Sequence, residues 1–185
     1  MQIAVYSGSF DPLHIGHLAI LEHLTEDCGY DCVYLVVSPQ NPFKDPSKAE
    51  SARRRFDAAA EAVARYPELR VRVDDIELGM EPPHYTIRTL RTLQAREPDN
   101  DFTLVIGADN LAVFRGWRDY ADVLREFGVA VFPREGFDIE AISTDLLEED
   151  NSYRIRIVDA PMVTVSSTQI REGEARGEDM SHLRM

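Results

Sequence analysis

Two histidines three positions apart stand out among the residues that could do chemistry. His14 and His17 belong to the stretch SGSFDPLHIGH, residues 7–17, which follows a short apolar run. Residues with this spacing near a helix start lie on nearly the same face, so both imidazoles can converge on one oxygen-rich group. Gly8 lets a ligand approach the backbone, and a helix beginning near Ile15 would direct free amides and its positive dipole end at the loop. The stretch therefore predicts a phosphate site.

Other interpretations of the two histidines stay open on the residues alone. His14 could cap the helix while His17 packs half-buried, which is the commoner role for two arbitrary histidines. A metal pair would need a third ligand at a suitable spacing, and none stands out. Neither GxGxxG nor GxxxxGK[ST] is present, which disfavours the common dinucleotide and P-loop sites. The combination of strand, glycine, proline, two histidines and helix start favours phosphate.

A second stretch, near the other end of the sequence, combines hydroxyl groups with an arginine. VSSTQIR, residues 165–171, lies where a strand-like run gives way to a helical pattern. Ser167 or Thr168 could cap that helix and leave amides for an anion, and the guanidinium of Arg171 suits bidentate phosphate contact. Taken alone, SST before a helix is most often a simple cap. Together with the histidine stretch, it indicates a second group of phosphate ligands.

The elements that must position these groups are predicted from the hydrophobic pattern. Short runs rich in Val, Ile and Leu alternate with longer segments of helical period, which is typical of a parallel sheet covered on both faces. The predicted strands are residues 2–6, 32–38, 70–74, 102–106, 128–132 and 154–158. The predicted helices are residues 15–25, 51–66, 85–95 and 119–126. Right-handed crossovers then give an α/β fold with a doubly wound, mainly parallel sheet.

The first strand leads directly into the histidine stretch. In doubly wound sheets, ligands gather at the carboxyl ends of strands, where the strand order reverses. Residues 43–50 have the composition of a loop, and the acidic residues 137–151 are predicted as irregular, solvated surface. The sequence has no repeat, low-complexity tract or long linker, so we expect one domain over residues 1–185.

The composition limits the partners of the chain. Its 20 Lys and Arg face 33 Asp and Glu, a net charge of −13, which opposes nonspecific nucleic-acid binding. A small anionic ligand would need a locally positive pocket. The apolar runs are too short to span a membrane and no signal peptide is evident, so we expect a cytoplasmic protein without a membrane partner. Cys28 and Cys32 match no redox or zinc spacing and are expected as reduced, structural thiols.

Together, the two stretches resemble the signature motifs of the nucleotidylyltransferase superfamily. SGSFDPLHIGH is similar to GGxFDPxHxGH, and VSSTQIR resembles ISSTxIR, whose hydroxyls and arginine hold the β and γ phosphates of ATP. The resemblance implies a Rossmann-like nucleotidylyltransferase fold in which His14, His17 and Arg171 are catalytic. It implies an ATP site made of Gly8, Ser9, Phe10, His14, His17, Asp109, Ser167, Thr168 and Arg171. The sequence departs from the motif at Ser7, which replaces the usual glycine and adds a side chain close to the phosphate.

Three further segments are most similar to the bacterial nicotinate-nucleotide adenylyltransferase family. SPQNPFK, residues 38–44, resembles its PxxxPxK segment and would bring Lys44 towards phosphate, with a solvated loop lysine as the alternative. PPHYTIRTL, residues 82–90, is similar to its SYT segment, where backbone and Thr86 would meet the nicotinate carboxylate at a helix N-terminus. The alternative there is a simple N-cap with Tyr85 packed beneath it.

The third segment, IGADNLAVFRGW at residues 106–117, resembles the GxDxL segment of the same family with its downstream tryptophan. The flat face of Trp117 suits stacking on a pyridine ring, although a lone tryptophan is more often part of a core. Asp109 would hydrogen-bond a nucleotide ribose or hold the loop. The resemblance therefore implies a mononucleotide site made of Ser7, Lys44, Tyr85, Thr86 and Trp117.

The implied reaction is adenylyl transfer from ATP to nicotinic acid mononucleotide in NAD biosynthesis, giving deamido-NAD and pyrophosphate. Mg²⁺ would be carried on ATP, and no metal site of the protein's own is expected. The alternatives are nicotinamide mononucleotide or another phosphate acceptor as substrate, a relative that acts on phosphopantetheine or uses CTP, and a catalytically silent nucleotide-binding regulator. Assembly into a homo-oligomer is a further expectation.

Overall fold

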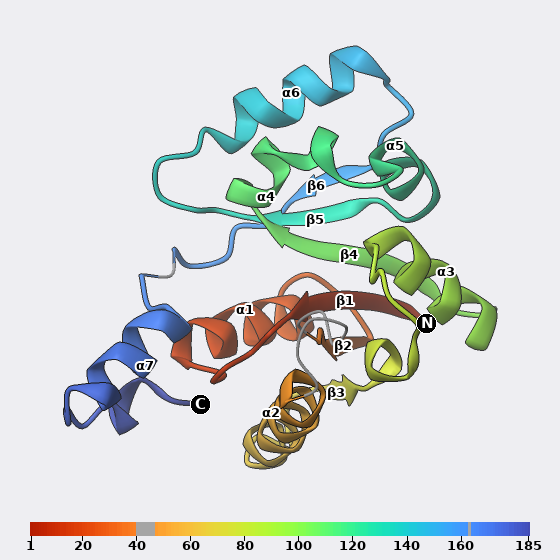
Figure 1. Cartoon of the computed structure of the whole chain (residues 1–185). Helices are drawn as coiled ribbons and strands as arrows, with labels where there is room; N and C mark the ends of the chain where they lie inside the picture. The colour runs from red at the N-terminus through yellow and green to blue at the C-terminus, as the bar shows by residue number, and fades with distance from the viewer. Residues whose placement is uncertain (40–46, 163) are drawn as a thin grey trace.

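The described residues contain six strands, which form one continuous sheet (Figure 1). The structure, a computed structural model, describes residues 1–39, 47–162 and 164–185, and it leaves the side chains of residues 47–50 undescribed. The strands are β1 Gln2–Gly8, β2 Cys32–Val37, β3 Val71–Asp74, β4 Asp101–Gly107, β5 Val129–Phe132 and β6 Ile155–Ile157. Their order is β3-β2-β1-β4-β5-β6, and every neighbouring pair is parallel. The predicted doubly wound α/β fold is confirmed.

The strand order reverses between β1 and β4. From β1 the chain adds β2 and β3 on one side, then returns to add β4, β5 and β6 on the other. Tyr6 of β1 accordingly pairs with Leu35 of β2 and with Val105 of β4. In open parallel sheets, ligands bind beside the carboxyl ends of the strands at such a reversal. The last residues of β1 therefore deliver the histidine stretch to this crevice.

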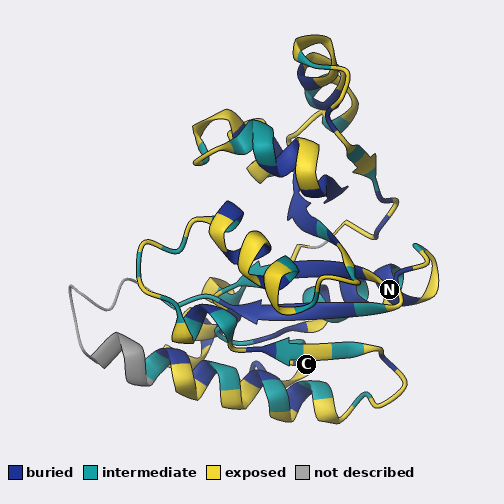
Figure 2. Cartoon of the chain, turned by 90° about the vertical axis from the view of Figure 1, so that its right-hand side faces the viewer, coloured by how far each residue is buried: buried dark blue, intermediate teal, exposed yellow. Residues whose placement is uncertain are grey.

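Helices cover both faces of the sheet (Figure 1). The helices are α1 Ile15–Glu26, α2 Ser47–Ala64, α3 Thr86–Arg96, α4 Ala108–Ala112, α5 Tyr120–Asp122, α6 Ile139–Glu149 and α7 Ser167–Ala175. Short 3₁₀ turns lie at η1 Ile76–Gly79, η2 Phe114–Gly116 and η4 Ser181–Leu183, and a π-helical turn at η3 Val123–Phe127. The helices enclose a core on each face, so the central strands are almost entirely buried (Figure 2).

Strand β1 shows why a continuous apolar run suits this position. Ile3 and Val5 point into the core shared with α3, whereas Ala4 and Tyr6 point into the core shared with α1 and α2. Successive side chains of a strand alternate between its two faces. Because both faces of β1 are covered, every position of the run has to be apolar.

The prediction of irregular structure for residues 137–151 is wrong, because α6 occupies most of this segment. Asp138 caps the helix through its side chain. Leu146 is buried, and Ile139 and Ile142 pack against the same core. These three apolar residues have helical spacing, but the acidic residues between them hid the pattern.

Other element boundaries also differ from the predictions. Helix α2 begins at Ser47 rather than residue 51, so part of the predicted loop at 43–50 is helical. The predicted helix 119–126 consists of the short α5 followed by the π-helical turn. Cys28 and Cys32 are both free thiols. Within the described ranges, no helix combines the length and apolarity that crossing a bilayer requires.

Candidate functional site

His14 and His17 hold each other and the first turn of α1 in place. His14 is the N-cap, and its Nδ1 accepts hydrogen bonds from the backbone N–H of Gly16 at 3.1 Å and of His17 at 3.3 Å. In return, the backbone N–H of His14 donates to His17 Nδ1 at 3.1 Å. The two rings stack with 3.7 Å between their centroids. The predicted local cap is therefore real, and it is also what aligns the pair.

These bonds fix the tautomer of each ring. Because Nδ1 of both His14 and His17 accepts a backbone hydrogen bond, the proton of each neutral ring sits on Nε2. Burial, aided by the nearby charge of Arg134, lowers the pKa of His14 to about 4. Burial, then His14 and Arg134, lower the pKa of His17 to about 3. At neutral pH the loop thus presents two parallel, uncharged N–H donors.

Aromatic packing fixes the remainder of the loop. Phe10 is buried, and its ring lies 5.2 Å from the His17 ring and 5.4 Å from the Tyr6 ring, edge to face in both pairs. A Cβ added at Gly8 would lie 3.1 Å from the Phe10 ring, so glycine suits this close approach. The side chain of Phe10 belongs to the core, which leaves its backbone for the predicted ATP contact.

Arg55 holds the same loop from α2. Its Nη1 donates to Ser9 O at 2.6 Å and to Ser38 O at 3.1 Å, and the residue is buried. The backbone of Ser9, one of the predicted ATP ligands, is thereby tied to the end of β2, while its side chain is exposed. Arg55 was not predicted as a site residue, because nothing in an arginine-rich helix shows which guanidinium turns inwards.

The C-terminal stretch lies against the same loop. Arg171 Nη1 donates to Asp11 O at 2.6 Å, and Ser167 Oγ donates to Pro12 O at 2.8 Å. Arg171 Nη2 also donates to Thr168 Oγ1 at 3.2 Å. Figure 1 shows α7 beside the start of α1. Residues 160 positions apart therefore meet here, as the paired motifs require.

The predicted cap of α7 needs a correction. Neither Ser167 nor Thr168 caps the helix, because the N-cap is Ser166, whose side chain accepts from the backbone N–H of Gln169 at 3.1 Å. Ser167 and Thr168 lie in the first turn instead. The Ser167 hydroxyl bonds the opening loop, and the Thr168 hydroxyl accepts from Arg171, so Thr168 orients the arginine rather than the helix end.

Asp109 and Arg134 follow β4 and β5 and face each other at 3.6 Å, Oδ1 to Nε. Among the described residues, these two buried atoms have no hydrogen-bond partner. A Cβ at Gly107 would lie 2.4 Å from Asp109 Oδ1, so only glycine leaves room for the carboxylate. The sequence analysis missed Arg134, although its position just past the predicted strand 128–132 was a usable signal.

A cavity of about 220 Å³ lies at the strand reversal. Its lining includes three of the predicted mononucleotide residues, Ser7, Thr86 and Trp117, from three separate parts of the chain, and Gly8 of the predicted ATP site. Ser38 and Asn110 add polar groups that the sequence analysis did not select. Trp117 is half-buried, with its ring 4.7 Å from that of Phe114. The indole therefore contributes both to the core and to the cavity wall.

The two other predicted mononucleotide residues are not part of this lining. Tyr85 is 36% exposed and is the N-cap residue of α3, with the guanidinium of Arg118 4.9 Å above its ring. It is thus not packed beneath the helix as the simpler alternative expected. Lys44 lies outside the described residues.

Comparison with known proteins shows the family to which the chain belongs. The family model described as cytidylyltransferase-like matches residues 5–173, so the chain belongs to the cytidylyltransferase-like family. A probable nicotinate-nucleotide adenylyltransferase of Bacteroides fragilis is 36% identical over 97% of this chain and 85% of its own length. Its counterpart in Flavobacterium psychrophilum is 37% identical over 93% of this chain and 86% of its own length. Within the family, the chain belongs with the nicotinate-nucleotide adenylyltransferases, which confirms the predicted resemblance.

Solved structures share the fold. Plasmodium falciparum nicotinic acid mononucleotide adenylyltransferase complexed with NaAD matches with a TM-score of 0.76 at 18% identity, over 97% of this chain and 87% of that one. A putative nicotinate-nucleotide adenylyltransferase from Vibrio parahaemolyticus matches with a TM-score of 0.62 at 21% identity, over 100% of this chain and 86% of that one. At these identities the likeness concerns the fold alone.

Proposed function

We infer that the chain transfers the adenylyl group of ATP to nicotinic acid mononucleotide, releasing pyrophosphate and forming deamido-NAD. One observation carries this inference: the stacked His14 and His17 present parallel N–H donors on a loop that Arg171 contacts from the far end of the chain. The kinship with nicotinate-nucleotide adenylyltransferases supports the same activity.

The reaction needs no protein nucleophile. An oxygen of the mononucleotide 5′-phosphate attacks the α-phosphorus of ATP, and the bond from that phosphorus to the bridging oxygen of pyrophosphate breaks. Catalysis of such transfers depends on alignment of the two phosphates and on stabilising the negative charge of the nonbridging oxygens. Groups that could align the two phosphates and groups that could stabilise this charge lie near the strand reversal.

The phosphate-binding groups divide between the two ends of the chain. The Nε2–H groups of His14 and His17 would donate to the α-phosphate, while Gly8 and Ser9 supply backbone. Neutral imidazoles suit this role, because Nδ1 of each ring accepts from the backbone while Nε2 keeps a proton that can be donated to a phosphate oxygen. Arg171, oriented by Thr168 Oγ1 and Asp11 O, would hold the departing pyrophosphate.

Asp109 and Arg134 provide a place for the nucleoside part of ATP. Asp109 Oδ1 and Arg134 Nε are buried against each other as a long ion pair without a hydrogen bond, while the rest of both side chains is partly exposed and can meet a ligand. A ribose hydroxyl could donate to the carboxylate and accept from the guanidinium. This arrangement favours ribose binding over the alternative in which Asp109 only holds its loop.

Mg²⁺ would enter with ATP. The groups placed around the phosphates are imidazole and guanidinium N–H donors, which bind phosphate oxygens, whereas Mg²⁺ prefers oxygen ligands. Among the described residues, no three His, Cys, Asp or Glu side chains come together as a metal site. The phosphate oxygens would therefore hold the ion, which supplies neutralising charge.

The cavity of 220 Å³ would receive the pyridine ring. Trp117 offers a flat face for stacking. Thr86 is the first residue of α3, and the free amides of that helix end favour a carboxylate over a neutral amide. The cavity thus supports the acid rather than nicotinamide mononucleotide as substrate.

A product assay tests the proposed function. The full chain is incubated with ATP, Mg²⁺ and one phosphate acceptor at a time: nicotinic acid mononucleotide, nicotinamide mononucleotide or phosphopantetheine. The products are identified by their molecular mass in mass spectrometry, and the release of pyrophosphate is measured in parallel. We expect deamido-NAD as the preferred product. Binding of ATP without pyrophosphate release would identify a silent regulator, and preference for another acceptor would contradict the proposed substrate.

A further inference from the structure

A continuous chain of hydrogen bonds runs from the cavity wall to a buried carboxylate. Ser7 Oγ lies 2.9 Å from Ser38 Oγ, and both side chains line the 220 Å³ cavity. Ser38 Oγ in turn donates to Glu77 Oε2 at 2.6 Å. Glu77 comes from η1 and is only 4% exposed. These hydrogen bonds therefore link Ser7, the residue at which this sequence departs from the family motif, to the carboxylate of Glu77, which lies outside the cavity lining.

The carboxylate determines the direction of every bond in this chain. An ionised carboxylate only accepts, so the single proton of the Ser38 hydroxyl points to Glu77. Ser38 Oγ must then accept from Ser7, which commits the Ser7 proton as well. Within the described part of the chain, Ser7 Oγ has no other hydrogen bond. Its lone pairs are thus left to receive a donor from the cavity.

Glu77 also fixes the helix on the other side of the cavity. Its Oε1 accepts from Thr89 Oγ1 at 2.8 Å, and Thr89 lies one turn after Thr86 on α3. Both carboxylate oxygens are therefore bonded to elements that line the cavity. A buried carboxylate is costly unless its oxygens are satisfied in this way.

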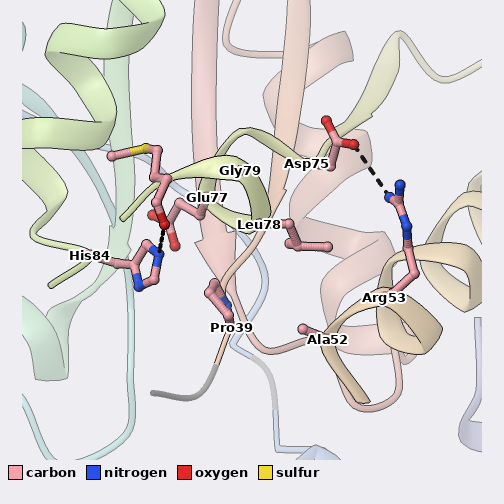
Figure 3. A pocket seen from close by; sticks show the side chains of 9 residues that line it. Pro39, Ala52, Arg53, Asp75, Glu77, Leu78, Gly79 and His84 are labelled. Atoms are coloured by element: carbon pink, nitrogen blue, oxygen red, sulfur yellow. Dashed lines mark hydrogen bonds and ion pairs between the residues drawn. The ribbon is translucent and has the colours of Figure 1, made fainter. Parts of the chain in front are cut away.

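A second cavity, of about 350 Å³, lies on the outer side of Glu77 (Figure 3). Figure 3 shows His84 beside Glu77, and Asp75 and Arg53 across the cavity. Asp75 pairs with Arg53 at 3.3 Å and does not contact Ser38. Asp75 is therefore a nearby carboxylate that stands outside the hydrogen-bonded chain.

We propose that Glu77 is a positioning residue which, through Ser38, makes Ser7 Oγ a hydrogen-bond acceptor for a ribose hydroxyl of the bound mononucleotide. At neutral pH these hydroxyls are the hydrogen-bond donors of nicotinic acid mononucleotide, because its carboxylate and phosphate accept. The role rests on the proposed function and explains why serine can replace the glycine of the family motif. Glycine at this position would forgo the contact.

Substitution of Glu77 by Met, written E77M, tests whether Glu77 sets the donor and acceptor roles of Ser38 and Ser7. Without the carboxylate, the Ser38 proton turns to Ser7, and the Ser7 proton then points into the cavity. We expect the KM for nicotinic acid mononucleotide to rise roughly three- to tenfold, the effect of one lost neutral hydrogen bond, while kcat and the KM for ATP stay within about twofold. E77Q should restore most of the affinity, because an amide oxygen can still accept from Ser38 while Thr89 turns to Tyr85 O.

A double-mutant cycle with Ser7→Gly distinguishes positioning from general support. S7G alone should raise the same KM by a similar factor, and adding E77M should then change it less than about twofold. An equal effect of E77M in both backgrounds would mean that Glu77 does not act through Ser7, and would overturn the proposal. D75N is the matched control and should leave the KM unchanged.

The experiment also distinguishes a variant that fails to fold from a failure of the proposed function. If E77M does not fold, S38A breaks the same series of hydrogen bonds while Glu77 keeps its bond from Thr89. A double-mutant cycle of S38A with S7G is then judged by the same criterion. A wild-type enzyme that forms no deamido-NAD contradicts the proposed function itself. An active wild type with additive effects contradicts only the role of Glu77.

Discussion

The loop of residues 7–17 and the 220 Å³ cavity are adjacent but held together in different ways. In the loop, side chains bond to the main chain: His14 to backbone amides of α1, Arg55 to Ser9 O and Arg171 to Asp11 O. In the cavity, side chains bond to one another, as in the chain through Ser38. A backbone partner remains in place when another side chain is substituted. A network of side chains, in contrast, changes when any one of its members is substituted. We infer that the loop sets the reaction and the cavity sets the acceptor.

The largest expected effect is a loss of turnover caused by a substitution in the loop. His17→Ala should lower kcat about a hundred- to a thousandfold, because it removes a donor to the charge that develops on the phosphate. It also removes the acceptor for the His14 amide, so thermal unfolding must be measured alongside. Pyrophosphate release gives the rate. His23→Ala is the matched control, since His23 lies on the same helix but pairs with Asp27. A folded H17A enzyme with near-normal turnover would contradict the assigned role.

A smaller, selective effect is expected in the cavity. Trp117→Ala should raise the KM for the mononucleotide roughly tenfold, as expected for loss of aromatic stacking, and leave the KM for ATP unchanged. Initial rates at varied concentrations of each substrate check this. Tyr120→Ala is a suitable control, because Tyr120 packs against the same core without lining the cavity. An unchanged mononucleotide KM would remove Trp117 from the site.

The smallest effect is on stability and again concerns the loop. The pKa of His14 is about 4 in the folded chain, below its ordinary value of 6.5, so the unfolded chain takes up this proton first on acidification. The free energy of unfolding should therefore decrease as the pH falls from about 6.5 towards 4.5. The slope should be shallower in His14→Asn, which keeps a capping oxygen but does not titrate. Urea unfolding at several pH values measures both slopes, and equal slopes would contradict the shifted pKa.

The same contrast explains what could be predicted from the sequence. The loop is local in sequence: strand, glycine, histidines and helix start follow one another, so its geometry could be foreseen from short-range rules. The doubly wound parallel sheet followed from the alternation of apolar runs and helices. The cap was predicted at Ser167 or Thr168, one or two residues after Ser166, because three consecutive hydroxyls could each have served.

The cavity was only partly predictable, because its members come from distant elements. Trp117 and Thr86 were found through family resemblance, whereas Ser38 and Glu77 have no local signature. Glu77 sits in an acidic segment, and the sequence does not show that folding buries Asp74 and Glu77 but leaves Asp75 at the surface. Tyr85 points to Arg118 rather than into the cavity, a difference that only tertiary contacts decide. The cytoplasmic location and the homo-oligomer stay predictions.

The contact between Arg171 and Asp11 has a consequence for biosynthesis. Chains fold as they emerge from the ribosome, N-terminal parts first. The guanidinium that completes the surroundings of the histidines is translated 160 positions after Asp11. A nascent chain that still lacks α7 would have only those proposed phosphate ligands that the opening loop supplies. We therefore expect activity to begin only after α7 has been translated.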